Sequence, residues 1–326
     1  MNVLVVGAGS VGQVFGHHLQ LAGAHVTFFV REQYVAATGQ GFTLYPLNDR
    51  GARDRPVRFE DFEVLSDIAA VAERPWDHVY LCIPATGLQG AWFEALVKAV
   101  ADAVLVSLTP GLNDRAYVHA HFRSERVVTG MIGFSSYPGP LEGESLPEPG
   151  TVYWFPPLMP SPFEGARGSV ESVVGLLRQG GLPATVDQKL PQKVAYPTAA
   201  LMSFISGLEL EAWSFDALRK SARLKVVSAA IRETVAILNA HQNSRAPLAL
   251  RLIGSPVFKL GLPLAQGVTP FDFEAFLRVH FLKVRAQTLV LLADYIALAE
   301  KHHLPSKHLQ ALAGDLQSLP EQVEAA

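Results

Sequence analysis

The sequence predicts an α/β fold in which a doubly wound, mostly parallel sheet is followed by an all-helical domain. In the first part, short apolar runs alternate with helical stretches, and this pattern requires right-handed crossovers between parallel strands. After Asp187 the strand signals largely stop, and apolar residues recur at helical spacing. A chain of 326 residues is long enough for two cores. We therefore expect two domains, residues 1–188 and 189–326.

Individual elements follow from the same patterns. Strands of the first domain are expected at residues 2–6, 25–30, 42–46, 77–84 and 103–110, with helices at 10–23, 87–100 and 168–181. Strands and turns rich in proline and glycine, at residues 126–139 and 151–160, predict an antiparallel extension of the same domain. The helical domain is expected to use residues 196–213, 223–243 and 271–303. Residues 244–270, rich in Pro and Gly, predict a loop with one short helical turn at most.

The composition indicates which partners and which compartment to expect. The formal charge is −3, with 49% hydrophobic and 17% charged residues, and no Lys/Arg cluster stands out, so neither nucleic acid nor a membrane surface is an expected partner. Cys82 is the only cysteine, which excludes an intrachain disulfide and fits a reducing cytoplasm. The late apolar run at 288–299 contains Asp294 and is too short for a membrane span, so it predicts a core helix. No signal peptide precedes the first strand, and a cytoplasmic location is expected.

The chain begins with a strand, a G-x-G-x-x-G motif and an amphipathic helix. Gly7 allows the tight turn, Gly9 lets the backbone approach a pyrophosphate, and Gly12 lets helix and strand pack closely. The helix then begins at Ser10 and Val11, whose free N–H groups face the phosphates together with the positive end of the helix dipole. This context predicts a Rossmann-type dinucleotide site.

The second strand ends in Arg31 where NAD-binding domains place an acid. An arginine near this position accommodates the 2′-phosphate of NADP, whereas an acid accepts hydrogen bonds from the ribose 2′-OH of NAD. Arg31 therefore predicts NADP, although neighbouring Glu32 leaves an NAD site open.

No metal site is expected, because His17 and His18 are adjacent and do not share a helix face. Both histidines are expected at the surface or half-buried.

The first third of the chain resembles the 2-dehydropantoate 2-reductases, also called ketopantoate reductases, through residues 1–31 and the two-domain layout. The resemblance implies an NADPH-dependent enzyme that reduces a small carbonyl substrate, with Lys193 as catalytic proton donor. A positioned acid is chemically reasonable because hydride delivery to a ketone leaves a developing alkoxide. Pro84 and Pro110 take the places of a lysine and an asparagine beside the cofactor. The second domain is expected to bind substrate, and a homodimer is left open.

Several positions depart from the family pattern. Pro197 and Leu201 replace two asparagines, Ala275 a serine, and Gln287 a glutamate. These departures predict a more apolar substrate pocket, next to Met202 and Phe204 in sequence. Because proline lacks an N–H, the helix carrying Lys193 is expected to start later or to kink at Pro197.

Two hypotheses from different classes follow. The chain is either a reductase of the ketopantoate reductase type whose substrate need not be ketopantoate, or a catalytically silent NADP(H)-binding protein of the same fold. Lys193 favours the enzyme, and the missing polar side chains favour the silent protein. Another two-domain reductase, of the opine or hydroxyacid type, is disfavoured because no histidine has a convincing acidic partner. His280 lies at helical spacing beside Leu277 and Val284, where packing or solvent exposure is the commoner role.

Overall fold

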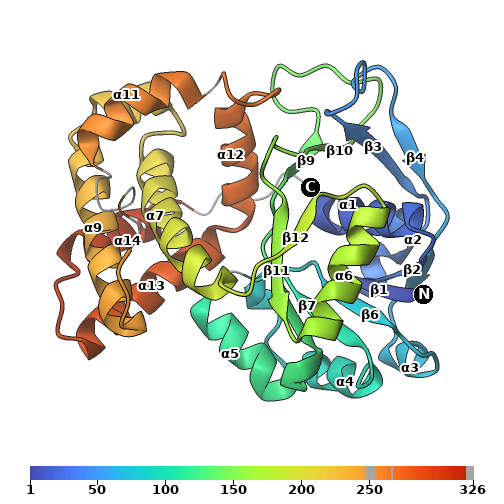
Figure 1. Ribbon diagram of the computed structural model, residues 1–326. Coiled ribbons are helices and arrows are strands. Elements are labelled where there is room, and N and C mark those ends of the chain that lie inside the picture. The colour runs from blue at the N-terminus through green and yellow to red at the C-terminus, as the bar shows by residue number, and fades with distance from the viewer. Residues whose placement is uncertain (110, 247, 249–253, 266, 321–326) are drawn as a thin grey trace. The chain divides into compact units, whose positions relative to one another are not determined.

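A computed structural model describes residues 1–109, 111–246, 248, 254–265 and 267–320. The chain divides into two compact units, Met1–Leu190 and Pro191–Ala326. The boundary expected from the sequence lies between residues 188 and 189. Figure 1 shows strands and helices in the first unit and helices in the second.

The first unit is built on an eight-stranded sheet in the order β12-β11-β8-β7-β6-β1-β2-β5 within the described residues. All neighbouring strands are parallel except β11, which runs antiparallel to β8. The strands are β1 (Asn2–Val6), β2 (His25–Phe29), β5 (Glu63–Leu65), β6 (His78–Leu81), β7 (Val104–Ser107), β8 (Val127–Gly130), β11 (Ser161–Gly165) and β12 (Ala184–Val186). The predicted doubly wound sheet is confirmed.

Helices cover both faces of this sheet because its strands are apolar on both sides. Val3 and Val5 of β1 pack in one buried cluster with residues of α1 and α6, whereas Leu4 and Val6 pack in a second cluster with residues of α3, α4 and α5. Successive side chains of a strand point to opposite faces, so a run of apolar residues serves both clusters. The helices are α1 (Ser10–Leu21), α3 (Ile68–Ala72), α4 (Ala91–Ala99), α5 (Leu112–His121) and α6 (Arg167–Gln179).

A second sheet, in the order β4-β3-β10-β9, lies over α1 (Figure 1). Its strands are β3 (Phe42–Pro46), β4 (Val57–Phe59), β9 (Ser135–Gly139) and β10 (Gly150–Trp154). The antiparallel pairing expected after residue 126 occurs between β9 and β10, but in this separate sheet. β3 likewise leaves the alternating β/α order and pairs in parallel with β10. Short elements complete the unit: α2 (Val35–Thr38), η1 (Glu32–Tyr34), η2 (Ala85–Gly87) and η3 (Ser124–Arg126).

All regular elements among the described residues of the second unit are helices. Its helices are α7 (Leu190–Leu210, which begins at the last residue of the first unit), α8 (Phe215–Lys220), α9 (Arg223–Gln242), α11 (Ser255–Ala265), α12 (Phe273–Lys283), α13 (Arg285–Lys301) and α14 (Lys307–Gln317). No described helix combines the length and apolar character needed to cross a membrane. The run at 288–299 forms a core helix, with Leu291, Leu292 and Tyr295 buried.

Two expectations for this unit are wrong. The segment 244–270 contains α11, a helix of 11 residues that buries Leu262 and stacks Phe258 on Phe204 of α7. Pro256 does not prevent this helix because it stands in the first turn, where an N–H has no intrahelical acceptor. Of the two alternatives for the helix that carries Lys193, a later start is wrong, since α7 begins at Leu190 and contains Pro197 in its interior. A kink at Pro197 stays a prediction.

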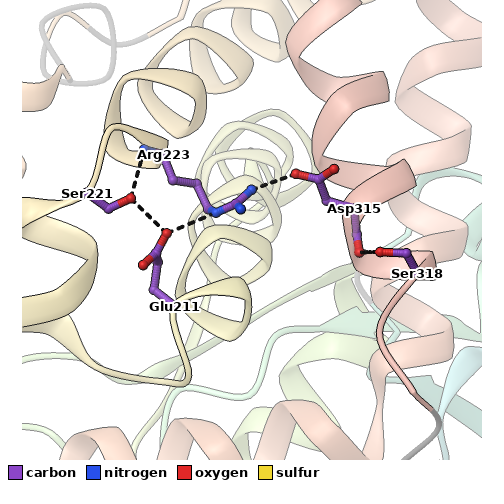
Figure 2. A network of polar contacts seen from close by, with 5 residues as sticks. All are labelled: Glu211, Ser221, Arg223, Asp315 and Ser318. Carbon is purple, nitrogen blue, oxygen red and sulfur yellow. Dashed lines mark hydrogen bonds and ion pairs between the residues drawn. The ribbon is translucent and has the colours of Figure 1, made fainter.

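Charged side chains fix the helices of the second unit to one another. Figure 2 shows Arg223 at the start of α9, where Nε donates to Glu211 Oε1 at 3.0 Å and Nη1 donates to Asp315 Oδ2 of α14 at 2.6 Å. Ser221 donates to the same Glu211 oxygen at 2.8 Å. On α9, the Glu233 carboxylate accepts from the backbone N–H of His308 and of Leu309 and so caps α14.

Candidate nucleotide-binding site

The carboxyl end of β1 is where the order of the large sheet reverses. β1 lies between β2 on one side and β6 on the other, and all three strands are parallel. In open α/β sheets, ligands bind in the crevice outside the strand ends at this switch point. The glycine motif follows β1 directly, so it lies at the position that the topology favours for a ligand.

At the first and third glycines of the motif, neighbouring atoms lie too close to leave room for a side chain. Gly7 has φ +98°, and a Cβ there would lie 2.7 Å from Cγ2 of Ile83. A Cβ on Gly12 would lie 2.1 Å from the carbonyl oxygen of Gly7, closer than any real contact. Helix α1 therefore packs against the turn at a distance that only glycine permits.

Gly9 differs from both because it faces open space. An added Cβ would meet no atom within 4 Å, and the backbone has φ −70° and ψ 175°. Gly9 is the N-cap of α1, which has no side-chain cap and no acid in its first turn. Among the described residues, the N–H groups of Gly9, Ser10 and Val11 have no acceptor. Three donors and the positive end of the helix dipole thus meet next to unfilled space, as an anion site requires.

Arg31 follows β2 at the same edge of the sheet and is exposed. Its guanidinium lies over the Tyr34 ring, 5.1 Å from the centroid, and Nη2 donates to the Tyr34 hydroxyl at 3.2 Å. In the described part of the chain, no carboxylate pairs with Arg31. The neighbouring carboxylate of Glu32 accepts a hydrogen bond from Ser66, just after β5. Arg31 therefore keeps its charge available for an anion, whereas Glu32 is already engaged.

The loop after β6 lies at the carboxyl end of the strand that pairs with β1 on the side opposite β2. Pro84 is exposed and is the N-cap residue of the short helix η2. Cys82 is half-buried beneath the glycine turn, and burial raises the pKa of its thiol well above the ordinary value. A neutral thiol of this kind has no nucleophilic role. Pro110, also expected to line the site, lies outside the described residues.

The two histidines of α1 are buried, which corrects the expectation that they lie at the surface or half-buried. Nδ1 of His18 lies 2.7 Å from the carbonyl oxygen of Gly180, and the His17 ring packs on Phe59 of the second sheet. Burial, and secondarily the neighbouring His18, lower the pKa of His17 to about 4. No group of three or more His, Cys, Asp or Glu among the described residues could hold a metal ion.

Lys193 lies in the second unit, in the first turns of α7, and its side chain is exposed. Pro197 and Leu201 follow at intervals of four residues and are exposed as well, so all three share one stripe of the helix. The other substituted positions are half-buried, Ala275 in α12 and Gln287 in α13. His280 stacks on Phe276 and burial lowers its pKa, which favours a packing role.

Sequence reasoning missed three residues near the glycine loop. Gln13 donates from Nε2 to the carbonyl oxygen of Ala8 at 2.8 Å, and Thr151 of β10 donates to Oε1 of Gln13 at 2.6 Å. Tyr34, which supports Arg31, is the third. Gln13 directly follows the glycine motif and could have been singled out as a polar side chain in the first turn. Nothing in the sequence indicates that Thr151 reaches it.

The sequence was compared with models of known protein families and with curated proteins. Residues 3–143 match the family model described as ketopantoate reductase PanE/ApbA. No curated protein sequence matches the chain. The recognised resemblance to ketopantoate reductases is thus confirmed for a divergent chain.

Solved structures extend the likeness in fold to the whole chain. A 2-dehydropantoate 2-reductase from Geobacter metallireducens superposes with a TM-score of 0.74 at 17% identity, covering 97% of this chain and 99% of that one. D-mandelate dehydrogenase, solved with NADH and anilino(oxo)acetate, gives 0.72 at 13% identity and covers 98% and 97%. A PanE/ApbA family ketopantoate reductase from Ralstonia eutropha gives 0.71 at 16% identity, covering 97% of both chains.

Proposed function

We propose that this chain, whose residues 3–143 match the ketopantoate reductase family, is an NADPH-dependent reductase of a small 2-oxo acid or ketone. The observation that carries the proposal is the glycine turn at the switch point of the sheet, with unpaired N–H groups beside open space. These residues fit a dinucleotide because a pyrophosphate needs backbone donors and a close approach to the chain.

The cofactor would be held at two places. Gly9, Ser10 and Val11 would donate their N–H groups to the pyrophosphate, while Gly7 and Gly12 keep the turn and the helix close enough to form that cradle. Arg31 would bind the 2′-phosphate in a charge-assisted contact, with its guanidinium kept in place by Tyr34. This contact is the basis for NADPH over NADH. Pro84 would lie near the nicotinamide end.

When bound, NADPH would supply a hydride to the carbonyl carbon of the substrate, and negative charge would develop on the oxygen. The oxygen then needs a proton, which Lys193 would donate from its ammonium group to complete the O–H bond. The lysine regains a proton from water. A cation beside the oxygen also stabilises the negative charge that develops there.

The substrate would be bulkier or less charged than ketopantoate. Recognition of a carboxylate and a hydroxyl requires buried polar partners, since leaving each unpaired costs about 1–3 kcal/mol. Pro197 and Leu201, on the same stripe as Lys193, offer apolar surface instead. The D-mandelate dehydrogenase of similar fold was solved with anilino(oxo)acetate.

A steady-state assay tests this proposal. The purified chain is mixed with NADPH and a panel of aliphatic and aromatic 2-oxo acids and ketones, and loss of the nicotinamide absorbance is followed. We expect turnover of the bulkier members and poor reduction of ketopantoate. Lys193→Ala should lower kcat by at least about a hundredfold with NADPH affinity nearly unchanged. Lys189→Ala, at another exposed lysine, is the matched control and should retain activity.

The alternative function is a silent NADP(H)-binding protein, favoured by the loss of the polar side chains at Pro197, Leu201 and Ala275. Tight NADPH binding without turnover of any panel member would support it. Efficient reduction of ketopantoate by the wild type would instead return the chain to the reaction of its family.

A cytoplasmic location and a homodimer are further parts of the proposal. Sedimentation of the purified chain measures its oligomeric state.

A further inference from the structure

We propose that Gln13 and Thr151 form a positioning relay that aims the N–H of Gly9 at the cofactor pyrophosphate, and this rests on the proposed function. Thr151 donates to the Gln13 carbonyl oxygen at 2.6 Å, and the Gln13 amide donates to the Ala8 carbonyl oxygen at 2.8 Å. The relay therefore runs from the second sheet, through the side chain of α1, to the backbone of the glycine turn.

The relay acts through the geometry of one peptide group. The bond between Ala8 and Gly9 is trans, so its C=O and N–H point in opposite directions. Because Gln13 holds the carbonyl oxygen of Ala8, the N–H of Gly9 points away from the Gln13 amide. That N–H has no acceptor among the described residues, and the position beside Gly9 is open to at least 4 Å.

Two further polar groups of the turn are also fixed. The N–H of Gly7 donates to the carbonyl oxygen of Phe29 at 3.0 Å, and the carbonyl oxygen of Gly9 accepts from the Gln13 N–H at 2.9 Å. Gly9 carries no side chain that could hold its own peptide plane, and glycine has the largest conformational freedom of any residue. The side chain of Gln13 supplies the missing constraint on the peptide between Ala8 and Gly9.

The Ala8 oxygen determines how the Gln13 amide is turned, because a carbonyl oxygen can only accept. The NH₂ group of Gln13 therefore faces Ala8, and its carbonyl oxygen faces β10, where buried Thr151 donates to it and holds the side chain. The reverse orientation would place two acceptors, the Gln13 and Ala8 oxygens, against each other. This arrangement gives the second sheet a role in cofactor binding that its distance in sequence from the glycine motif conceals.

The test measures the affinity of the wild type, Gln13→Met and Thr151→Val for NADPH, NADH and ADP-ribose by titration, with thermal unfolding in parallel. Methionine keeps the length of the glutamine side chain and removes both hydrogen bonds. We expect Gln13→Met to weaken all three ligands by the same factor, about fivefold to twentyfold, because the pyrophosphate is common to them. Thr151→Val should weaken them by a smaller common factor, and Thr151→Ser should restore affinity.

Gln20→Ala is the matched control, since Gln20 is on the same helix and also donates its amide to a loop carbonyl, that of Asp61, at 3.0 Å. It should bind all three ligands like the wild type. Wild-type affinity in both Gln13→Met and Thr151→Val, with the wild type itself binding, would overturn the relay alone. A wild type that binds none of the ligands would refute the proposed function and the relay with it. A change in the ratio of NADPH to NADH affinity would overturn the relay in favour of an effect at Arg31.

Discussion

The contacts around α1 in the first unit differ in kind from the contacts between the helices of the second unit. Around α1 the contacts are backbone approaches at glycine, aromatic rings and buried histidines whose pKa values are lowered. Between the helices of the second unit, guanidinium and carboxylate groups join α7 to α13 and α9 to α14, and Figure 2 shows the second of these pairs. The first region should therefore respond to added volume and to acid, and the second to the loss of a charge.

The largest expected effect is that of one methyl group at the glycine turn. Gly12→Ala places a Cβ 2.1 Å from the Gly7 oxygen, so backbone atoms must move, and we expect a loss of about 5 kcal/mol in the stability of the first unit. Gly9→Ala is the control, because its Cβ meets nothing, and its unfolding should match the wild type. Hydrogen exchange read by mass spectrometry separates the two units. Equal stability of the two variants would contradict the close-approach argument.

Loss of a charge should have the next largest effect, in the second unit. Arg285 Nε donates to Glu209 Oε1 at 2.6 Å, and the two side chains are 14% and 3% exposed. Arg285→Ala leaves the Glu209 carboxylate buried and uncompensated, which should cost about 3–5 kcal/mol in chemical denaturation. The double variant Glu209→Leu with Arg285→Met should recover most of the loss. Lys220→Ala, in an exposed pair, should change nothing measurable, and a comparable loss there would remove the distinction between buried and exposed pairs.

The next largest effect is expected from acid, which should lower the stability of the first unit. Burial lowers the pKa of both His17 and His78 to about 4, so both are neutral in the fold, whereas the unfolded chain takes up protons below about 6.5. The unfolded state then binds more protons than the folded state, and stability falls as pH drops from 6.5 towards 4, by up to roughly 3 kcal/mol for each histidine.

Unfolding of the first unit measured at intervals between pH 7.5 and 4 checks this dependence. His17→Phe, which cannot take up a proton and removes an Nδ1 atom without a partner, should flatten part of the curve. A wild-type midpoint that stays constant between about pH 6.5 and 4.5 would show that these histidines do not govern acid stability.

The smallest expected effect concerns ligand binding and leaves the fold intact. Arg31→Ala should reduce the preference for NADPH over NADH by about 1–3 kcal/mol, because it removes a charge-assisted contact to the 2′-phosphate. Tyr34→Phe, which keeps the ring and loses the hydroxyl that Arg31 contacts, should reduce it less. Equal affinity of the wild-type protein for both cofactors would refute Arg31 as the determinant.

Features that follow from local geometry could be predicted from the sequence alone. Short apolar strands alternating with helical stretches predicted the doubly wound sheet, and helical spacing predicted the all-helical second unit. The glycine motif also identified its turn correctly, because the close approaches at Gly7 and Gly12 permit no side chain. For the role of Lys193, the sequence supplies a prediction that the experiments above test, and the roles of Pro84 and Pro110 stay predictions.

Tertiary structure decided what depends on partners distant in the chain. β3 and β10 pair across about a hundred residues, and this second sheet buries His17 and His18 although both are polar. The same sheet brings Thr151 to Gln13, and packing of Phe258 on Phe204 makes a helix of a segment rich in proline and glycine. Local propensity is worth at most a few kcal/mol across a segment, and burial of apolar surface against distant residues outweighs it. That balance is why the glycine turn could be located from the sequence, whereas the side chains that support it could not.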